Sequence, residues 1–151
     1  MKIFIIAGEP SGDEYGAKLI EELKKNNPVI SFNGIGGSLM VQQGLKSMVP
    51  LNEVAVMGFS EIIKKIAYFL DLEKKILSFI KTNSPDKVIL IDYPGFNLRI
   101  AKKIKSISKT KIIYYISPQV WAWKEKRIKI IKKYIDELLV IIFLRKFSIM
   151  F

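Results

Sequence analysis

The stretch "KVILIDYPGFN", residues 87–97, decides the fold of this chain. In it a buried strand leads directly to a carboxylate, a group that can take part in catalysis. Its first part, Lys87–Ile91, is a continuous apolar run of the kind that fills the middle of a parallel sheet. The run ends on Asp92, and Pro94 and Gly95 follow before a helical pattern begins. A carboxylate in this position predicts either a cap for that helix or a general base.

Short apolar runs alternate with helical patterns on both sides of this stretch. The alternation is typical of βαβ units and predicts an α/β fold with a parallel sheet flanked by helices. Further strands are expected over Ile3–Ala7, near Val29–Phe32, over Lys111–Ile116 and over Glu137–Phe143. Helices are expected over Tyr15–Lys25 with Asp13 as its cap, from Ser38, over Phe59–Asn83 with a potential break at Ala67–Leu72, over Phe96–Ser106 and over Lys124–Tyr134.

The composition excludes several classes of function. The 151 residues suit one domain and include no cysteine and no histidine, which excludes disulfides, thiolate metal sites and catalytic Ser-His or Cys-His arrangements. The excess of positive charge lies in residues 99–151, which hold 14 Lys+Arg against 3 Asp+Glu. Such a basic segment is typical of proteins that bind nucleic acid, an anionic membrane surface or a phosphorylated substrate. Drift in an A+T-rich genome explains the charge better than nucleic-acid binding, because 22 of the 25 cations are Lys and no nucleic-acid-binding motif accompanies them. A nucleic-acid partner is therefore not expected.

No segment of the sequence predicts a membrane span. After the first strand the longest apolar run, Leu138–Leu144, is far shorter than the roughly 20 apolar residues that a spanning helix needs. The sequence therefore predicts a cytosolic protein, or one that lies on a membrane without crossing it.

Three loops stand out because ligands of parallel sheets bind outside the carboxyl ends of the strands. The loop Gly8–Asp13 could offer backbone N–H groups to a phosphate, a carboxylate or a sugar, although a tight turn explains it equally well. The loop Ser117–Trp123 carries two tryptophans, which either stack on sugars and acyl chains or fill the core. The third loop, 92–97, follows the central strand. Between the first two, Gly34–Gly37 lacks the spacing of a dinucleotide-binding fingerprint.

Asp92 and Glu9 are the leading candidates for a general base in a chain without histidine. Because Asp92 comes directly after a buried strand, a neighbouring positive charge or hydrogen-bond donor is expected to keep it ionised.

The segment 60–80 predicts an amphipathic helix. Core packing is the usual role of such an apolar stripe, and a lipid-facing role becomes attractive only if the substrate is itself a lipid. The apolar side comprises Ile62, Ile63, Ile66, Phe69 and Leu70.

Six motifs occur in the order and with the spacing of the lipid-A-disaccharide synthase family, which the chain resembles from residue 1 to about residue 142. They are Gly8–Asp13 with Gly16-Ala17, Gly34–Gly37 with Met40, Val56-Met57-Gly58, Pro85-Asp86, Ile91–Leu98, and Ser117–Trp123 followed by Lys124 and Arg127.

The resemblance implies an inverting glycosyltransferase with two Rossmann-like domains of the GT-B type, of which residues 1–142 form the N-terminal, acceptor-side and lipid-side domain. The implied reaction moves diacylglucosamine from UDP-2,3-diacylglucosamine to the 6-hydroxyl of 2,3-diacylglucosamine 1-phosphate. It yields the β-1,6-linked disaccharide 1-phosphate of lipid A and UDP, and it needs no metal or other cofactor. The acylated substrates imply peripheral attachment to the cytoplasmic face of the inner membrane of a Gram-negative bacterium, and the apolar stripe then becomes a membrane-docking surface.

Residue roles follow from the same resemblance. Asp92 is implied as the base and Glu9 as a second essential carboxylate, and Gly95 stands where many family members carry another acid. The implied substrate-binding residues are Gly8, Ser11, Gly12, Asp13, Gly36, Gly37, Met57, Gly58, Asn97, Ser117, Gln119, Trp121, Trp123, Lys124 and Arg127.

The chain departs from the family at its end. Residues 143–151 do not follow the family pattern and could arise from a frameshift, natural or introduced in sequencing. The C-terminal domain that supplies most UDP-binding residues is not among the 151 residues, so we expect a truncated chain without efficient turnover. The alternative is a non-catalytic α/β module that binds a lipid, a sugar phosphate or an anionic membrane surface.

Overall fold

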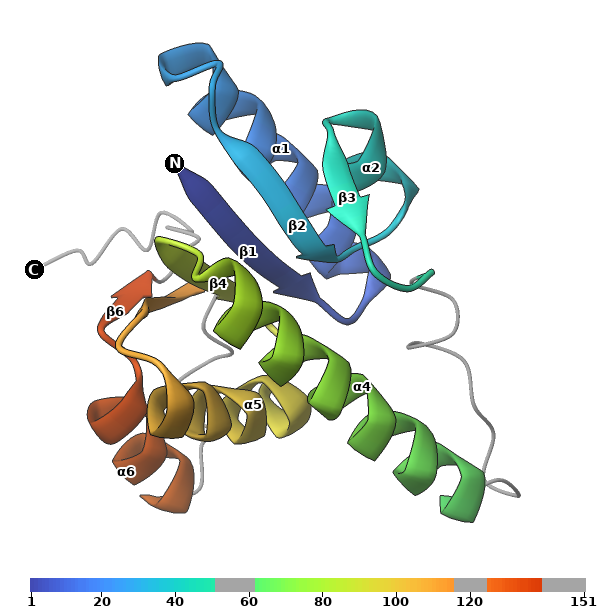
Figure 1. Ribbon diagram of the computed structural model, residues 1–151, viewed down its shortest axis with the longest axis vertical. Helices are drawn as coiled ribbons and strands as arrows, with labels where there is room; N and C mark the ends of the chain where they lie inside the picture. Colours follow the sequence, from blue (N-terminus) through green and yellow to red (C-terminus); the bar gives the residue numbers. More distant parts are fainter. Residues whose placement is uncertain (51–61, 116–124, 140–151) are drawn as a thin grey trace, which may run out of the picture.

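The computed structural model describes residues 1–50, 62–115 and 125–139, and it has a six-stranded parallel sheet at its centre (Figure 1). The strand order is β3-β2-β1-β4-β5-β6, with parallel pairing between neighbours. The strands are β1 (Lys2–Ala7), β2 (Ser31–Ile35), β3 (Leu45–Ser47), β4 (Lys87–Ile91), β5 (Lys111–Tyr115) and β6 (Glu137–Leu139). The parallel α/β sheet expected from the sequence is confirmed.

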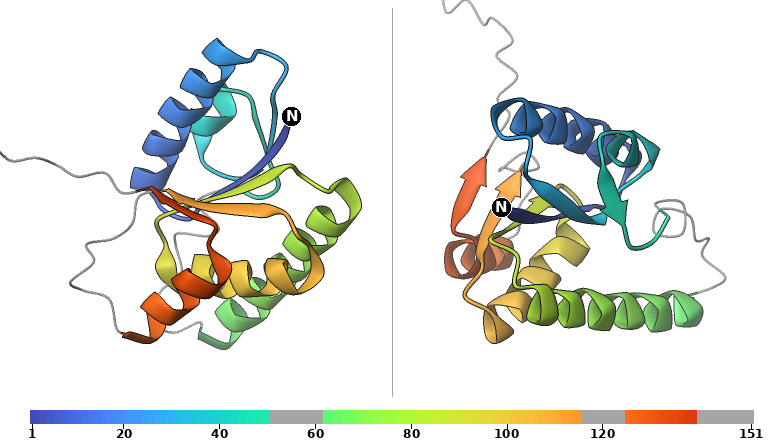
Figure 2. Two further views of the ribbon diagram at one scale, coloured as in Figure 1. Left: turned by 90° about the vertical axis from the view of Figure 1, so that its left-hand side faces the viewer. Right: turned by 45° about the horizontal axis from the view of Figure 1, so that its top comes forward.

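Helices cover both faces of the sheet (Figure 2). Two of them, α1 and α2, pack on one face, and α4, α5 and α6 pack on the other. The helices are α1 (Pro10–Asn26), α2 (Ser38–Gln42), α4 (Ile62–Asn83), α5 (Pro94–Ile107) and α6 (Glu125–Tyr134). The sheet therefore lies between two layers of helices, as it does in Rossmann-like domains.

The strand order places a topological switch point between β1 and β4. From β1 the chain builds the sheet outward through β2 and β3, and it then returns to β4 on the other side. Ala7 and Ile91 are register partners at the carboxyl ends of these two strands. The loops that follow β1 and β4 consequently begin side by side, which is where open α/β sheets bind ligands.

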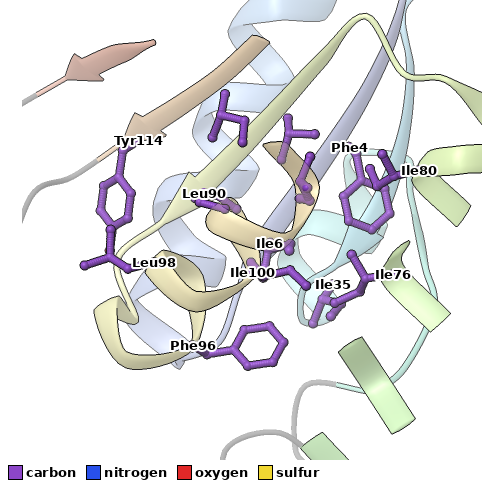
Figure 3. Close-up of a cluster of buried hydrophobic side chains, with 14 of the residues drawn as sticks. Phe4, Ile6, Ile35, Ile76, Ile80, Leu90, Phe96, Leu98, Ile100 and Tyr114 are labelled. Carbon is purple, nitrogen blue, oxygen red and sulfur yellow. The ribbon is translucent and has the colours of Figure 1, made fainter. Parts of the chain in front are cut away.

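Two hydrophobic clusters hold the layers together. The larger one lies under α4 and α5 and includes Phe4 and Leu90 from the sheet, Ile76 from α4 and Ile100 from α5 (Figure 3). These side chains are fully buried, because strands covered on both faces must be apolar on both faces. The smaller cluster lies under α1 and α2 and includes Ile20.

A buried ion cluster joins α4 to α5. The Glu73 carboxylate on α4 is 1% exposed, and it pairs with the Arg99 guanidinium and the Lys103 ammonium on α5. Both cations come from partly exposed side chains. Both positive partners of the buried carboxylate therefore come from α5, and their side chains extend to it from the protein surface.

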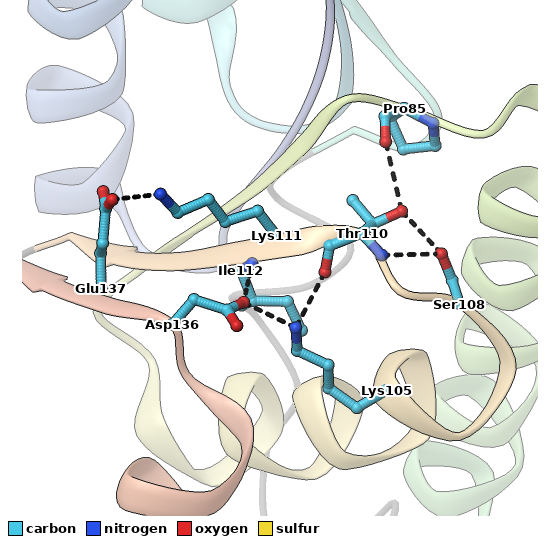
Figure 4. Close-up of polar contacts among 8 residues, drawn as sticks. All are labelled: Pro85, Lys105, Ser108, Thr110, Lys111, Ile112, Asp136 and Glu137. Atoms are coloured by element: carbon cyan, nitrogen blue, oxygen red, sulfur yellow. Dashed lines mark hydrogen bonds and ion pairs between the residues drawn. The ribbon is translucent and has the colours of Figure 1, made fainter.

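A second polar cluster fixes the amino-terminal end of β5 (Figure 4). The Asp136 carboxylate accepts hydrogen bonds from the Ile112 backbone N–H and the Lys105 ammonium, both at 2.6 Å. Burial alone would raise the pKa of Asp136, but these two donors outweigh burial and lower it. Lys111 and Glu137 form an ion pair between β5 and β6 beside this cluster.

Some element boundaries differ from the expectations. The Lys87–Ile91 strand was predicted correctly, and the helix α4 runs through Ala67–Leu72 without the expected break. The first helix begins at Pro10, five positions before Tyr15. The short strand β3 was not expected from the sequence, and residues 140–143 of the last predicted strand lie outside the described residues.

Candidate functional site

The loops after β1 and β4 touch each other at the switch point. Gly8 is buried beneath the aromatic ring of Tyr93, and a Cβ atom on Gly8 would lie only 2.5 Å from Cδ1 of that ring. Glu9, the next residue, is exposed and occupies the N-cap position of α1. Position 8 requires glycine because the Tyr93 ring approaches it this closely. The same contact places Glu9 beside the Asp92 turn.

The turn after β4 has an uncommon backbone conformation. Asp92 and Tyr93 both have φ of +46°, in the left-handed region, which costs about 1–2 kcal/mol for each non-glycine residue. The Asp92 backbone carbonyl accepts hydrogen bonds from the Tyr114 hydroxyl at 2.6 Å and from the Asn97 side-chain amide at 2.7 Å. Since each bond contributes about 0.5–1.5 kcal/mol, together they offset a substantial part of this cost.

The Asp92 side chain does not cap the helix that follows. The N-cap of α5 is Tyr93, and no side chain makes a capping hydrogen bond there. The half-buried Asp92 carboxyl has its pKa raised by burial, against the lowering effect of a hydrogen bond from the Tyr93 backbone N–H. The expected donor is therefore present, but burial outweighs it. A carboxylate with a raised pKa is a stronger base than an ordinary one.

Several ionisable groups act on one another at this edge of the sheet. Burial raises the pKa of Tyr114, the Asp92 charge raises it further, and Arg127 on α6 opposes both. Burial and the Glu9 charge raise the pKa of Tyr93. The charges of Glu9 and Asp92 thus both act on Tyr114. Two cations oppose these carboxylates, Arg99 at Tyr93 and Arg127 at Tyr114.

Asp13 has a different role from the one expected. It lies inside α1 and is 5% exposed, and its carboxylate accepts hydrogen bonds from the backbone N–H groups of Gly37 at 2.8 Å and of Leu39 and Met40 at 3.1 Å each. The prediction that Asp13 caps the helix over Tyr15–Lys25 is wrong, because it caps the start of α2 instead. Its carboxylate links the loop Gly8–Asp13 to the loop Gly34–Gly37, and the expected contact of Asp13 with a substrate stays a prediction.

Asn97 is also committed to the protein backbone. Its side chain is fully buried, and its amide nitrogen donates to the carbonyls of Ile91 at 3.1 Å and Asp92 at 2.7 Å. The fully buried side chain therefore supports the shape of the turn, and the expected substrate contact of Asn97 stays a prediction.

The remaining predicted residues are distributed around the same edge. Ser11 is exposed at the start of α1, whereas Gly12, Gly36 and Gly37 are buried. Arg127 is partly exposed on α6. The predicted substrate-binding residues Met57, Gly58, Ser117, Gln119, Trp121, Trp123 and Lys124 lie outside the described residues.

The predicted lipid-facing stripe on α4 divides into two parts. Ile66 and Leu70 are exposed, by 56% and 47%. Phe69 is half-buried and packs against Phe96 of α5 with the ring centroids 5.5 Å apart, so its predicted lipid contact stays a prediction. The side chains of the other two predicted residues, Ile62 and Ile63, lie outside the described part of the structure.

Within residues 1–50, 62–115 and 125–139, no helix is long and apolar enough to cross a membrane. In the same ranges no group of three or more acidic, histidine or cysteine side chains has the geometry to hold a metal ion.

Sequence reasoning missed Tyr93 and Tyr114. Tyr93 stands between two predicted site residues, which was the available signal. Tyr114 carried no signal, because an aromatic residue in a buried strand is ordinary and its partner Asp92 is 22 positions away.

Comparisons with known proteins show which family this chain is similar to. The model of the lipid-A-disaccharide synthetase family matches residues 3–146. The lipid-A-disaccharide synthase of Francisella philomiragia subsp. philomiragia is 46% identical over 142 residues, which cover 94% of this chain and 37% of that protein. The synthase of Francisella tularensis subsp. novicida is 44% identical over the same shares of the two chains. The chain therefore spans little more than a third of the length of these curated relatives.

Proposed function

Since this chain belongs to the lipid-A-disaccharide synthetase family, we propose that it is the N-terminal, acceptor-side part of a lipid-A-disaccharide synthase. The proposed enzyme transfers diacylglucosamine from UDP-2,3-diacylglucosamine to the 6-hydroxyl of 2,3-diacylglucosamine 1-phosphate. The observation that carries the proposal is the half-buried Asp92 carboxyl at the switch point, beside the exposed Glu9.

Asp92 is the general base of the proposed reaction. Its carboxylate takes the proton of the acceptor 6-hydroxyl while the oxygen forms a bond to the anomeric carbon of the donor. The bond from that carbon to UDP breaks on the opposite side, and UDP leaves with the bonding electrons, so that the anomeric configuration inverts. The raised pKa of Asp92 supports this role, because a base accepts a proton more readily as its pKa approaches the working pH.

Glu9 serves as the second carboxylate of the proposed site. It is exposed on the adjoining loop, and its charge raises the pKa of Tyr93 and of Tyr114. A carboxylate in this position can accept hydrogen bonds from sugar hydroxyls. Arg127 supplies the positive charge that a phosphorylated substrate requires.

A chimeric enzyme tests the catalytic proposal. Because the chain spans 37% of the Francisella philomiragia synthase, the matched 142 residues of that enzyme are replaced by those of this chain. The chimera is expected to form the disaccharide 1-phosphate and UDP, and Asp92→Asn is expected to lower kcat by about 10²–10⁴. Asp71→Asn is the matched control, since Asp71 is an exposed carboxylate on α4. Equal losses in the two variants would contradict a special role for Asp92.

The lipid substrates lead to a second part of the proposal, that the chain docks on the cytoplasmic leaflet of the inner membrane. Exposed Ile66 and Leu70 on α4 supply apolar contacts, and α6 on the same face of the sheet carries exposed Lys129, Lys132 and Lys133. Each lysine near an anionic lipid surface contributes about 1 kcal/mol.

Vesicle sedimentation tests the docking. The double variant Ile66→Asp and Leu70→Asp should bind anionic phospholipid vesicles roughly 30- to 150-fold more weakly, because two half-exposed aliphatic side chains contribute about 2–3 kcal/mol. Leu39→Asp and Val41→Asp form the matched control on α2, where these side chains are 42% and 48% exposed on the opposite face. A chimera without turnover, combined with intact vesicle binding, would favour the non-catalytic lipid-binding module instead.

A further inference from the structure

Two fully buried side chains donate hydrogen bonds to the backbone carbonyls on either side of the Asp92 Cα atom. Asn97, from the first turns of α5, donates through its amide nitrogen to the Ile91 carbonyl at 3.1 Å and to the Asp92 carbonyl at 2.7 Å. Tyr114, from β5, donates its hydroxyl to the same Asp92 carbonyl at 2.6 Å. Three side-chain hydrogen bonds from two different elements thus converge on one turn, where the Asp92 backbone N–H also donates to the Tyr115 carbonyl at 3.3 Å.

These bonds determine the conformation of Asp92. The Ile91 carbonyl belongs to the peptide plane before the Asp92 Cα atom, and the Asp92 carbonyl belongs to the plane after it. The two planes meet at that atom, so one amide group that holds both carbonyls restricts φ and ψ of Asp92 together. The Tyr114 hydroxyl occupies the second acceptor position of the Asp92 carbonyl and locks the later plane from the side of β5.

The chemistry of the two donors suits a fixed role. Turning the Asn97 amide over would set its oxygen against two carbonyl oxygens, so only one orientation is possible. Within the described residues the Asn97 side-chain oxygen, buried as it is, has no hydrogen-bond partner. Burial raises the pKa of Tyr114, so its hydroxyl keeps its proton and remains a donor. The Asn97 side chain thus holds the turn through its nitrogen, while its buried oxygen stays without a hydrogen bond.

We propose that Tyr114 and Asn97 are positioning residues, which hold Asp92 in its left-handed conformation and thereby aim its carboxylate at the acceptor hydroxyl. This inference rests on the proposed function, because it assigns the two residues to the reaction in which Asp92 is the base. Neither side chain touches a substrate, since both are fully buried.

Nuclear magnetic resonance on the 151-residue chain tests the proposal without any substrate. Tyr114→Phe removes only the hydroxyl, and Tyr115→Phe, one position along β5, is the matched control. In the Tyr114 variant the HN–Hα couplings and backbone carbon shifts of Asp92 and Tyr93 should change. The midpoint of the Asp92 carboxyl titration should fall toward that of an ordinary aspartate, because a loosened turn admits water to the carboxyl.

The outcomes separate a positioning role from a structural one. A merely structural hydroxyl would lower the stability of the fold and leave the couplings and the titration of Asp92 as they are in the parent chain. Unchanged values in a folded Tyr114→Phe chain, or equal changes in Tyr115→Phe, would overturn the proposal. Asn97→Ser is the second variant if the first fails to fold, with the same expected changes and the same overturning result.

The test is independent of turnover. If the Asp92 signals stay unchanged while the chimera is active, the positioning inference fails and the proposed function stands. If the chimera with its natural Asp92 forms no disaccharide, the proposed function fails whatever the signals show.

Discussion

Replacing Gly8 by alanine should disturb the Asp92 turn through the Tyr93 ring. The added Cβ atom would lie 2.5 Å from Cδ1 and 2.7 Å from Cγ of that ring. Since carbon atoms prefer separations of about 3.5–4.0 Å, the ring and the loop must move apart by about 1 Å. Overpacking of this kind typically costs about 1–3 kcal/mol. We therefore expect a loss of that size in the free energy of unfolding, together with a lower kcat in the chimera.

Urea unfolding and the disaccharide assay measure the two effects. The double variant Gly8→Ala and Tyr93→Ala should recover most of the stability lost to Gly8→Ala, relative to Tyr93→Ala alone, because the clashing ring is gone. Gly95→Ala is the matched control, since no heavy atom lies within 4 Å of a Cβ atom built there. A Gly8→Ala chain as stable as the parent, or a penalty that persists without the Tyr93 ring, would refute the reasoning.

Three further predictions concern charges and are measured by urea unfolding. Replacing Arg99 and Lys103 by methionine should lower the free energy of unfolding by about 3–5 kcal/mol, because the Glu73 carboxylate stays buried and unpaired. Glu73→Met should be nearly neutral. A larger loss in Glu73→Met than in the Arg99 and Lys103 variant would contradict this account. Asp136 has a lowered pKa, so its contribution to the stability of the fold is present above the unfolded pKa of about 3.9 and is lost as pH falls through the folded pKa. Asp136→Asn should therefore lower the free energy of unfolding more at about pH 7 than at about pH 3. Equal losses at the two pH values would oppose this prediction. Asp92 has a raised pKa, so Asp92→Asn should stabilise the fold at about pH 7 but not at about pH 3, and destabilisation at about pH 7 would be the contrary result.

The sheet could be predicted because its central strands carry their signal locally. Lys87–Ile91 is a continuous apolar run, and it is a strand over the same residues in the structure. Leu45–Ser47 has no such signal, since it has three residues, is partly exposed and pairs only with β2. The turn-forming residues of Gly8–Asp13 argued against an early start of the first helix, yet α1 begins at Pro10 and Gly12 is buried within it.

The candidate site could be predicted only in part, because its geometry depends on partners distant in sequence. Asp92 and Glu9 follow strands, which placed both at the carboxyl edge of the sheet. The role of Asp13 depends on backbone groups 24 to 27 positions away, and that of Tyr114 on a carbonyl 22 positions away. The left-handed conformation of Asp92 and Tyr93 has no local signature either, because neither residue is glycine.

The dependence of kcat/KM on pH in the chimera tests the central claim most directly, namely that Asp92 is the general base at the switch point. The account predicts that activity falls on the acid side through one protonation whose pKa lies above 3.8, the ordinary value of this carboxyl, because burial raises it. In Asp92→Asn that limb should disappear and the remaining activity should be about 10²–10⁴ lower. An Asp92→Asn chimera that keeps both the acid limb and the full rate would contradict the claim.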